Sequence, residues 1–439
     1  MAVQAQNGST NHPAVRKRRV RIRYVVLAVL FVSTAINYLD RTNLSVAAPH
    51  IQHDLGLSAT ELGVILSAFS WGYAFLQIPG GWLLDRIGPR LAFGWALVLW
   101  SLATVATALA RGFGSLFAVR ASLGVLEAPA FPANGRLAAS WFPSSERGRA
   151  TAIYTAGEYV GLALAVPVLS MLVVAFGWQS VFVVTGVAGL VWAVVWFRQI
   201  RNTPQEDPRV DDDELAHIEE RHLGRANVVP SSAKLNWADL RYLLTRKRLW
   251  GIYLGQFAIN SAMFFFLTWF PSYLTQSRGL ELMEAGFYAS IPYLAALAGV
   301  LLGGWWSDSM LRRGVSVNVA RKTPIITGLF LATVIVAANY VDDVGLIVAI
   351  MSVAFFAQGM AAISWLLPPE IAPSRMVGLT GGVFNFVGNL GGASTPIVIG
   401  MIVDATGSFA GGLVFMSCVA LMGALSYVFL VDKVERLEG

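Results

Sequence analysis

The chain has 439 residues, of which 56% are hydrophobic and only 13% are charged. Soluble domains carry about 25% charged residues, so this composition predicts an integral membrane protein with many spans. The net charge of +6 does not indicate a nucleic-acid partner, because the basic residues fall at the ends of apolar runs.

Cysteine and histidine usage argues against two kinds of site. The single cysteine, Cys418, cannot form an internal disulfide or a cysteine metal cluster. The histidines fall outside the apolar runs, so we expect no metal site within the membrane. They are His12, His50, His53, His217 and His222.

A basic segment, 16–23, precedes the first apolar run, which is too long for the hydrophobic region of a signal peptide. We therefore expect residues 1–23 to be a basic cytoplasmic tail and the run to be the first helix.

Twelve apolar runs approach or exceed the roughly 20 residues that a spanning helix needs. They lie near 24–48, 60–84, 90–110, 113–138, 149–175, 179–198, 248–275, 284–306, 323–340, 345–368, 376–402 and 410–431. The sequence therefore predicts an all-α membrane protein.

A polar segment over 199–247 divides the runs six and six. It predicts an N-terminal bundle over 24–198, a C-terminal bundle over 248–432 and a short tail over 433–439. The acidic residues 211–214 suit a helix N-terminus, and we interpret the segment as a solvated cytoplasmic connector.

Lysine and arginine set the orientation. If the N-terminus is cytoplasmic, the opposite loops hold only Arg111 and Arg278, whereas the cytoplasmic segments hold most of the basic residues. This asymmetry predicts that both termini lie in the cytoplasm.

The two halves repeat one pattern. After the second run the chain reads Gly81, Asp85, Arg86, Gly88 and Arg90, and a degenerate copy follows the eighth run over 304–314. Internal repeats of this kind are expected in secondary transporters.

This string and the six-plus-six arrangement resemble the major facilitator superfamily over residues 24–432. The chain is more narrowly similar to the anion:cation symporter family, on the stretches 37–41, 126–132, 269–271 and 381–385. The resemblance implies proton-coupled uptake of an organic anion such as galactonate, glucarate or a hexuronate.

Ionisable side chains well inside the runs are confined to the first half. Burying such a charge in a bilayer costs at least about 2.5 kcal/mol, so we expect a functional site. Arg120 and Glu127 lie seven residues apart, which places them on one helix face about 10 Å apart. The set is Asp40, Arg41, Arg120, Glu127 and Glu158.

The resemblance assigns roles to three of these residues. It implies that Asp40 and Glu127 carry protons and that Arg41 holds the substrate carboxylate. Neighbouring helical residues differ in direction by about 100°, so Asp40 and Arg41 cannot point the same way. The alternative is a static buried ion-pair cluster that fixes helix packing.

Glu158 departs from the family, whose sugar-acid transporters often have glutamine at the corresponding place. An ionised Glu158 would repel an anion. One alternative is that Glu158 is protonated when substrate is bound, and another is that it pairs with Arg41 or Arg120. It could also accept hydrogen bonds from substrate hydroxyls or serve as an additional proton carrier. A purely structural role is a further alternative.

Further substrate contacts are expected, with interhelix packing as the alternative for Tyr73 and Trp365. The resemblance implies Tyr73, Ser364, Trp365 and Asn385, Arg120 is a further candidate, and Asn389, one turn beyond Asn385, is a weaker one. Gln256 and Asn260 either line the site or bond across helices, and the second reading is favoured.

The repeated string is expected to act in gating. The resemblance implies that the charged residues of this string, Asp85, Arg86 and Arg90, make contacts between the halves that hold the outward-open state. Gly81 and Gly88 permit close helix approach, and the positive charges of the arginines also signal topology.

The patterns predict a membrane transporter, and the resemblance implies a proton-coupled sugar-acid symporter of the bacterial inner membrane that works by alternating access. It would be a functional monomer in the lipid bilayer, with protons as coupling ion and no other cofactor. The rival interpretations are a symporter of aromatic or dicarboxylic acids and a sensor that binds a sugar acid without transporting it. An enzyme is not expected, because the chain has no nucleophile–base pattern and no phosphate loop.

Overall fold

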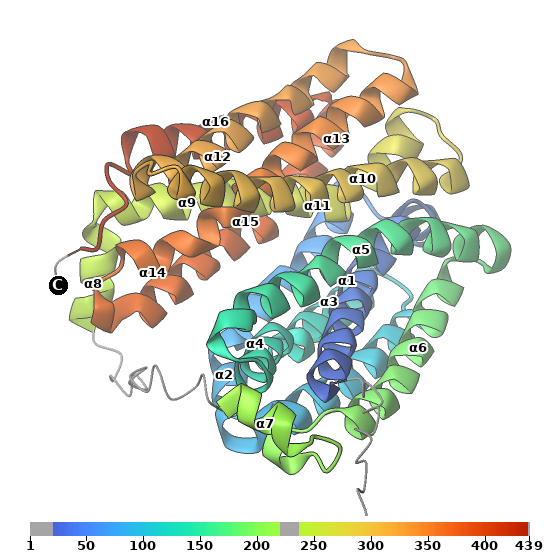
Figure 1. The fold of residues 1–439 in the computed structure, drawn as a ribbon. Helices are drawn as coiled ribbons and strands as arrows, with labels where there is room; N and C mark the ends of the chain where they lie inside the picture. Colours follow the sequence, from blue (N-terminus) through green and yellow to red (C-terminus); the bar gives the residue numbers. More distant parts are fainter. Residues whose placement is uncertain (1–20, 220–236, 438–439) are drawn as a thin grey trace, which may run out of the picture.

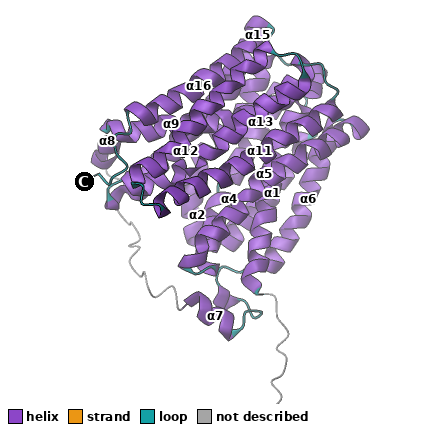
Figure 2. Cartoon of the chain, turned by 45° about the horizontal axis from the view of Figure 1, so that its top comes forward, coloured by secondary structure: helices purple, strands orange, loops and turns teal. Residues whose placement is uncertain are grey.

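The structure is a computed structural model that describes residues 21–219 and 237–437, apart from the side chains of Gln77, Ile78, Gly81, Trp82, Asp85 and Ser144. These residues form helices joined by loops and turns, with no strand among them (Figure 2). Twelve helical stretches are long and apolar enough to cross a membrane. The all-α class and the twelve spans are therefore confirmed.

The first half of the chain folds into α1 to α6. Their bounds are α1 (Ile22–Leu55), α2 (Ala59–Thr107), α3 (Phe113–Glu127), α4 (Ala130–Trp141), α5 (Ser144–Phe176) and α6 (Trp178–Gln199). α1 continues past its expected end and so contains His50 and His53. α2 contains two spans, joined at Gly88, where a φ of 79° interrupts the helical conformation.

The second half folds into α9 to α16. Its helices are α9 (Lys247–Thr268), α10 (Phe270–Ser272), α11 (Leu282–Arg312), α12 (Val317–Ala332), α13 (Val344–Met360), α14 (Leu367–Ile371), α15 (Val377–Thr406) and α16 (Ala410–Phe429). A π-helical turn, Tyr273–Ser277, follows α10, and 3-10 segments Thr333–Tyr340 and Ala361–Leu366 follow α12 and α13.

The halves meet where α2 packs on α15 and where α5 packs on α11 (Figure 1). Asp404, near the end of α15, accepts hydrogen bonds from the backbone N–H groups of Ala59 (2.8 Å) and Thr60 (2.7 Å) at the start of α2. Gly63 lies so close to α15 that an added Cβ would be 2.4 Å from the Pro396 carbonyl oxygen. These contacts lie at one end of the long helices.

Three apolar cores reflect this arrangement. The largest joins the halves and includes Leu44 and Leu62 with Phe266 and Phe355. A second core, from Val26 to Ile200, contains first-half residues alone. A third, from Leu243 to Val434, lies in the second half with the end of the linker. The halves therefore share a core at the end away from the linker and have separate cores beside it.

The linker contributes two short helices, α7 (Asp212–Glu219) and α8 (Trp237–Thr245), which lie against different halves (Figure 1). Glu214 of α7 is 6% exposed and accepts hydrogen bonds from the backbone N–H groups of Ile22 (2.9 Å) and Arg23 (3.1 Å). It thereby caps α1, whose first N–H groups have no partner within the helix. The interpretation of this segment as a merely solvated connector is wrong for α7. Residues 220–236 of the linker lie outside the described residues.

Candidate functional site

The site is built around α1, which packs against α5 and α6 and also contacts α2. Its polar residues Asn37, Asp40 and Arg41 are 2%, 1% and 7% exposed. An unpaired buried charge is costly, so the partners of Asp40 and Arg41 determine what the site can do.

Arg41 forms the central ion pair of the site. Its Nε lies 3.0 Å from Oε2 of Glu127, and the same oxygen accepts a hydrogen bond from Nδ2 of Asn37 at 2.8 Å. Glu127 is the last residue of α3, and Pro129 precedes α4. A proline lacks the backbone N–H that would continue the hydrogen-bond ladder, so the helix breaks here and Glu127 lies at the break.

Three aromatic rings surround the Arg41 guanidinium. Its Cζ lies 4.6 Å from the ring centre of Tyr38, 4.7 Å from Phe69 and 5.1 Å from Tyr73. Tyr73 also stacks on Phe69. Close approach of α2 and α3 holds these rings in place, since a Cβ on Gly124 would lie 2.0 Å from the Phe69 carbonyl oxygen. Tyr73 thus contacts the guanidinium that was expected to hold the substrate.

Arg120 belongs to the same network without touching Glu127. Its Nη2 donates a hydrogen bond to the Arg41 carbonyl oxygen at 3.3 Å, and its guanidinium lies over the Phe69 ring. The seven-residue spacing thus brings Arg120 and Glu127 into one buried cluster, with Arg41 between them.

Asp40 points away from Arg41, toward neighbouring helices. Its Oδ2 accepts a hydrogen bond from Nε1 of Trp100 at 3.1 Å, and its Oδ1 accepts one from Nδ2 of Asn43 at 3.2 Å. Asn43 also donates to Oγ1 of Thr185 on α6 at 2.7 Å. The sequence reasoning missed these partners. The spacing of Asn43, three residues after Asp40, was the one available signal.

Glu158 lies on α5 and hydrogen-bonds with Tyr38. Tyr38 is also one of the rings around Arg41. An ion pair between Glu158 and Arg41, one of the alternatives left open by the sequence, is not the arrangement found, because Arg41 is paired with Glu127. Arg120 is directed at the Arg41 carbonyl oxygen.

The second half presents neutral polar groups. Ser364, in the 3-10 segment after α13, is buried and donates to Oε1 of Gln256 at 2.9 Å. Gln256 in turn donates to Oδ1 of Asn260 at 3.0 Å. Gln256 therefore bonds across helices, as favoured from the sequence.

The other second-half candidates lie beside this group. Asn389 donates to the Asn385 carbonyl oxygen at 2.9 Å, which places the two amides on consecutive turns of α15. Trp365 is 51% exposed and packs edge-on against Phe384, with ring centres 5.2 Å apart. A Cβ on Gly381 or Gly382 would meet no atom within 4 Å, so the α15 surface one turn before Asn385 borders open space.

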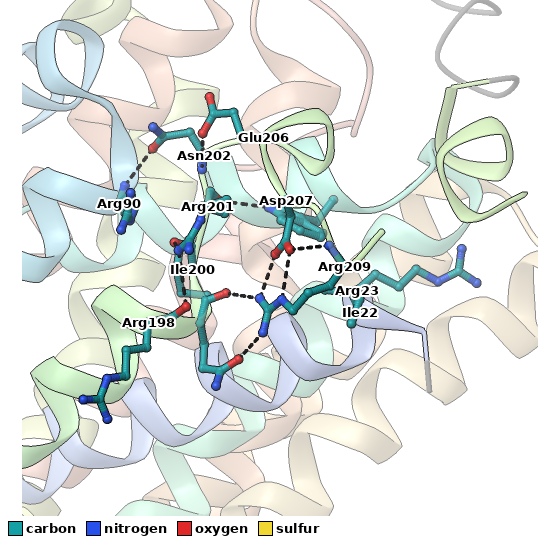
Figure 3. Close-up of polar contacts among 12 residues, drawn as sticks. Ile22, Arg23, Arg90, Arg198, Ile200, Arg201, Asn202, Glu206, Asp207 and Arg209 are labelled. Atoms are coloured by element: carbon teal, nitrogen blue, oxygen red, sulfur yellow. Dashed lines mark hydrogen bonds and ion pairs between the residues drawn. The ribbon is translucent and has the colours of Figure 1, made fainter. Parts of the chain in front are cut away.

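The gating string contacts the end of α6 and the first residues of the linker (Figure 3). The Arg90 backbone N–H donates to Oδ1 of Asn202 at 3.0 Å, and Arg90 Nη2 donates to the Phe197 carbonyl oxygen at 2.9 Å. A Cβ on Gly88 would lie 2.9 Å from Asn202 Oδ1. Arg90 therefore contacts its own half in this structure, and the contacts between halves expected for the outward-open state stay a prediction. Arg86 is exposed, and the side chains at Gly81 and Asp85 lie outside the described residues.

The first part of the linker is held by a compact polar turn. Arg209 Nη2 lies 2.7 Å from Oδ2 of buried Asp207 and donates to the Gln199 carbonyl oxygen at 2.8 Å (Figure 3). The hydrogen bonds from Arg209 hold the pKa of Asp207 below its usual range. This turn fixes the start of the linker to the end of α6.

Comparisons with known proteins agree with this architecture. The family model described as Major Facilitator Superfamily matches residues 30–396. The chain is 45% identical over 420 residues to a D-galactonate transporter of Escherichia coli O6:H1, covering 95% of this chain and 97% of the relative. It is 43% identical to the probable galactarate/D-glucarate transporter GudP of Bacillus subtilis, covering 96% and 94%. These relatives are transporters by name, which agrees with the expectation that the chain is not an enzyme.

A solved structure shows the same fold. The crystal structure of a bacterial homologue of the human lysosomal transporter Spinster matches with a TM-score of 0.76 and 18% sequence identity, covering 94% of this chain and 97% of that chain.

Proposed function

Because this chain belongs to the major facilitator superfamily, we propose that it imports a sugar acid together with protons by alternating access. The observation that carries this proposal is the buried Arg41–Glu127 pair, with a second buried carboxylate, Asp40, one residue from Arg41. A fixed cation that a carboxylate occupies can exchange that carboxylate for the carboxylate of a substrate. The names of the relatives support a galactonate, galactarate or glucarate substrate.

The proposed orientation places both termini and the linker in the bacterial cytoplasm, with six-helix bundles over 24–198 and 248–432 and tails at either end. The distribution of lysine and arginine supports it. With this orientation, the halves meet at the outer side, through Asp404 and the start of α2. The conformation is then the inward-facing one, and a functional monomer suffices.

In the proposed cycle, protons reach Asp40 and Glu127 from the outside. A protonated Glu127 no longer neutralises Arg41, so the guanidinium is released for the substrate carboxylate. The halves then rock, and substrate and protons leave to the cytoplasm. Arg120 stabilises the cluster by donating a hydrogen bond to the Arg41 carbonyl oxygen. Tyr73 contributes a ring face beside the bound anion.

In this proposal the second half recognises the hydroxyl groups of the substrate. Asn385, Asn389 and Ser364 offer amide and hydroxyl groups that both donate and accept hydrogen bonds. Trp365 offers an exposed ring face on which a sugar can stack. The open space beside Gly381 and Gly382 supports this placement.

The gating string has a separate proposed role. In the outward-facing state Gly81, Asp85, Arg86, Gly88 and Arg90 are expected to contact the second half at the cytoplasmic side. The contacts of Arg90 with Phe197 and Asn202 are those of the state in which that side is open.

Binding and transport are tested separately. Purified protein is screened for thermal stabilisation by D-galactonate, D-glucarate, D-glucuronate and 4-hydroxybenzoate. The proposal predicts stabilisation by the sugar acids, and stabilisation by the aromatic acid alone would contradict it. Proteoliposomes with an alkaline interior then test transport. We expect accumulation of the stabilising sugar acid, whereas binding without uptake would identify a sensor.

A further inference from the structure

Glu158 is a carboxylate that the proposed cycle leaves unused. It lies on α5, packed against α1, and is partly buried. Its partner is Tyr38, whose ring lies 4.6 Å from the Arg41 guanidinium. Glu158 is therefore close enough for its charge to act on Arg41 through one aromatic side chain, without pairing with it.

The charged groups that interact with Glu158 directly, or through Arg41 and its neighbours, belong to a small set. α1 supplies Asp40, Arg41 and the Tyr38 hydroxyl, and α3 supplies Arg120 and Glu127. Tyr73 on α2 and Tyr159, its neighbour on α5, complete the titratable groups. The middle parts of α6 and α11, which also pack on α5, carry no charged side chain. The net charge of this set is therefore the sum over two guanidinium groups and three carboxylates.

The net charge of this set depends on its protons. Arginine remains protonated in proteins. When Asp40 and Glu127 hold protons and Glu158 is ionised, the set carries one net positive charge. A sugar acid with one carboxylate, such as D-galactonate, brings one negative charge and neutralises the set. The loaded complex is then neutral, which favours its passage through a low-dielectric interior.

A sugar acid with two carboxylates, such as D-glucarate, brings one more negative charge. The complex regains neutrality if Glu158 also takes a proton from the outer solution and releases it inside. The contact with Tyr38 accommodates both states, because a phenol hydroxyl can donate to an ionised carboxylate or accept from a protonated one.

We propose that Glu158 is a third proton-carrying site, filled when the substrate has two carboxylates and ionised when it has one. The transporter then moves one more proton with each D-glucarate than with each D-galactonate. This inference rests on the proposed function and adds to it how proton number follows substrate charge.

One other cation on the same span does not alter the comparison. Arg136 lies on α4, nine residues beyond Glu127 and past the break in the span. Its charge is constant, so the difference between the two substrates remains one proton.

The test measures charge moved per substrate in proteoliposomes, from the voltage that stops net flux. With wild-type protein, each substrate is expected to move one net positive charge. With equal pH on both sides, a tenfold substrate gradient is then balanced by about 59 mV for both anions. With Glu158→Gln, D-glucarate loses its third proton, so its transport becomes electroneutral and independent of voltage. Glu158→Asp keeps an ionisable group and is expected to restore the voltage dependence.

Several results would overturn the inference. They are equal proton numbers for the two anions in the wild-type protein, transport of only one of them, or unchanged voltage dependence of D-glucarate transport in Glu158→Gln. The wild-type comparison stands even if that variant fails to fold. Failure of the proposed function gives a different result, because neither anion would then be driven by a pH gradient.

Discussion

The two halves place different chemistry at matching positions. The fourth span breaks at Glu127, between α3 and α4, and the tenth span breaks at Ser364, between α13 and α14. The first span carries Asp40 and Arg41, whereas its counterpart α9 carries Gln256 and Asn260. The fifth carries Glu158, and its counterpart α15 carries Asn385.

This difference separates two tasks. Carboxylates can gain or lose a proton, so the interior of the first half can change charge during a cycle. Amides and hydroxyls keep their charge but donate and accept hydrogen bonds, so the second half can recognise hydroxyl groups at any proton load. The separation of tasks can be tested by removing charge from the first half or by adding charge to the second.

The largest effect is expected from Arg41→Gln. It leaves Glu127 without its cation, and removing one partner of a buried ion pair costs about 3–5 kcal/mol. We expect loss of uptake and of thermal stabilisation by sugar acids. Glu127→Gln combined with Arg41→Gln is the matched control, because it should recover stability but not binding. Wild-type affinity in Arg41→Gln would refute the role of this residue.

Asp40→Asn is expected to separate exchange from accumulation. The amide keeps the shape of the side chain beside Trp100 and Asn43 but cannot release a proton. Exchange of labelled for unlabelled substrate should continue, while accumulation driven by a pH gradient is lost. Both fluxes are measured in the same proteoliposomes. Accumulation at the wild-type level would show that Asp40 does not couple protons.

Substitutions of Asn385 test whether the second half recognises hydroxyl groups independently of the proton load. Asn385→Ala removes hydrogen bonds of about 1 kcal/mol each, so we expect a five- to tenfold weaker apparent affinity with an unchanged pH profile. Asn385→Asp puts a carboxylate in the second half and is expected to weaken binding further, most strongly at high pH. A shifted pH profile in the alanine variant would contradict the separation of tasks.

The smallest effects concern the linker. Glu214→Ala removes the cap of α1 and is expected to lower stability by about 1 kcal/mol. Asp239→Ala, which breaks the partly exposed pair with Arg375 in the second half, is the control and should change stability less. Thermal unfolding of both variants measures the difference. Equal losses would show that α7 contributes no more than a surface ion pair.

The sequence predicted the spans and the charged residues well because both signals are local. An apolar run needs no partner to be recognised, and a charge within it is conspicuous. Pro129 and Pro132 in the fourth run also indicated a bend near Glu127, and the fourth span breaks there.

The partners of those charges were not predictable in the same way. Trp100 lies in an apolar run, where a tryptophan usually indicates packing, yet it donates to Asp40. Glu214 caps a helix that begins 192 residues earlier in the chain, and no local pattern indicates such a contact. The residue that pairs with Glu127 depends on how α1 turns against α3, which only the fold determines.

The most direct test of proton coupling follows internal pH when substrate alone is supplied. Proteoliposomes that hold a pH indicator, with equal pH on both sides, receive D-galactonate outside while the membrane potential is clamped at zero. The account predicts that the interior becomes acidic as substrate enters, and that Asp40→Asn abolishes this acidification. Entry of labelled substrate into wild-type vesicles with no change of internal pH would contradict it.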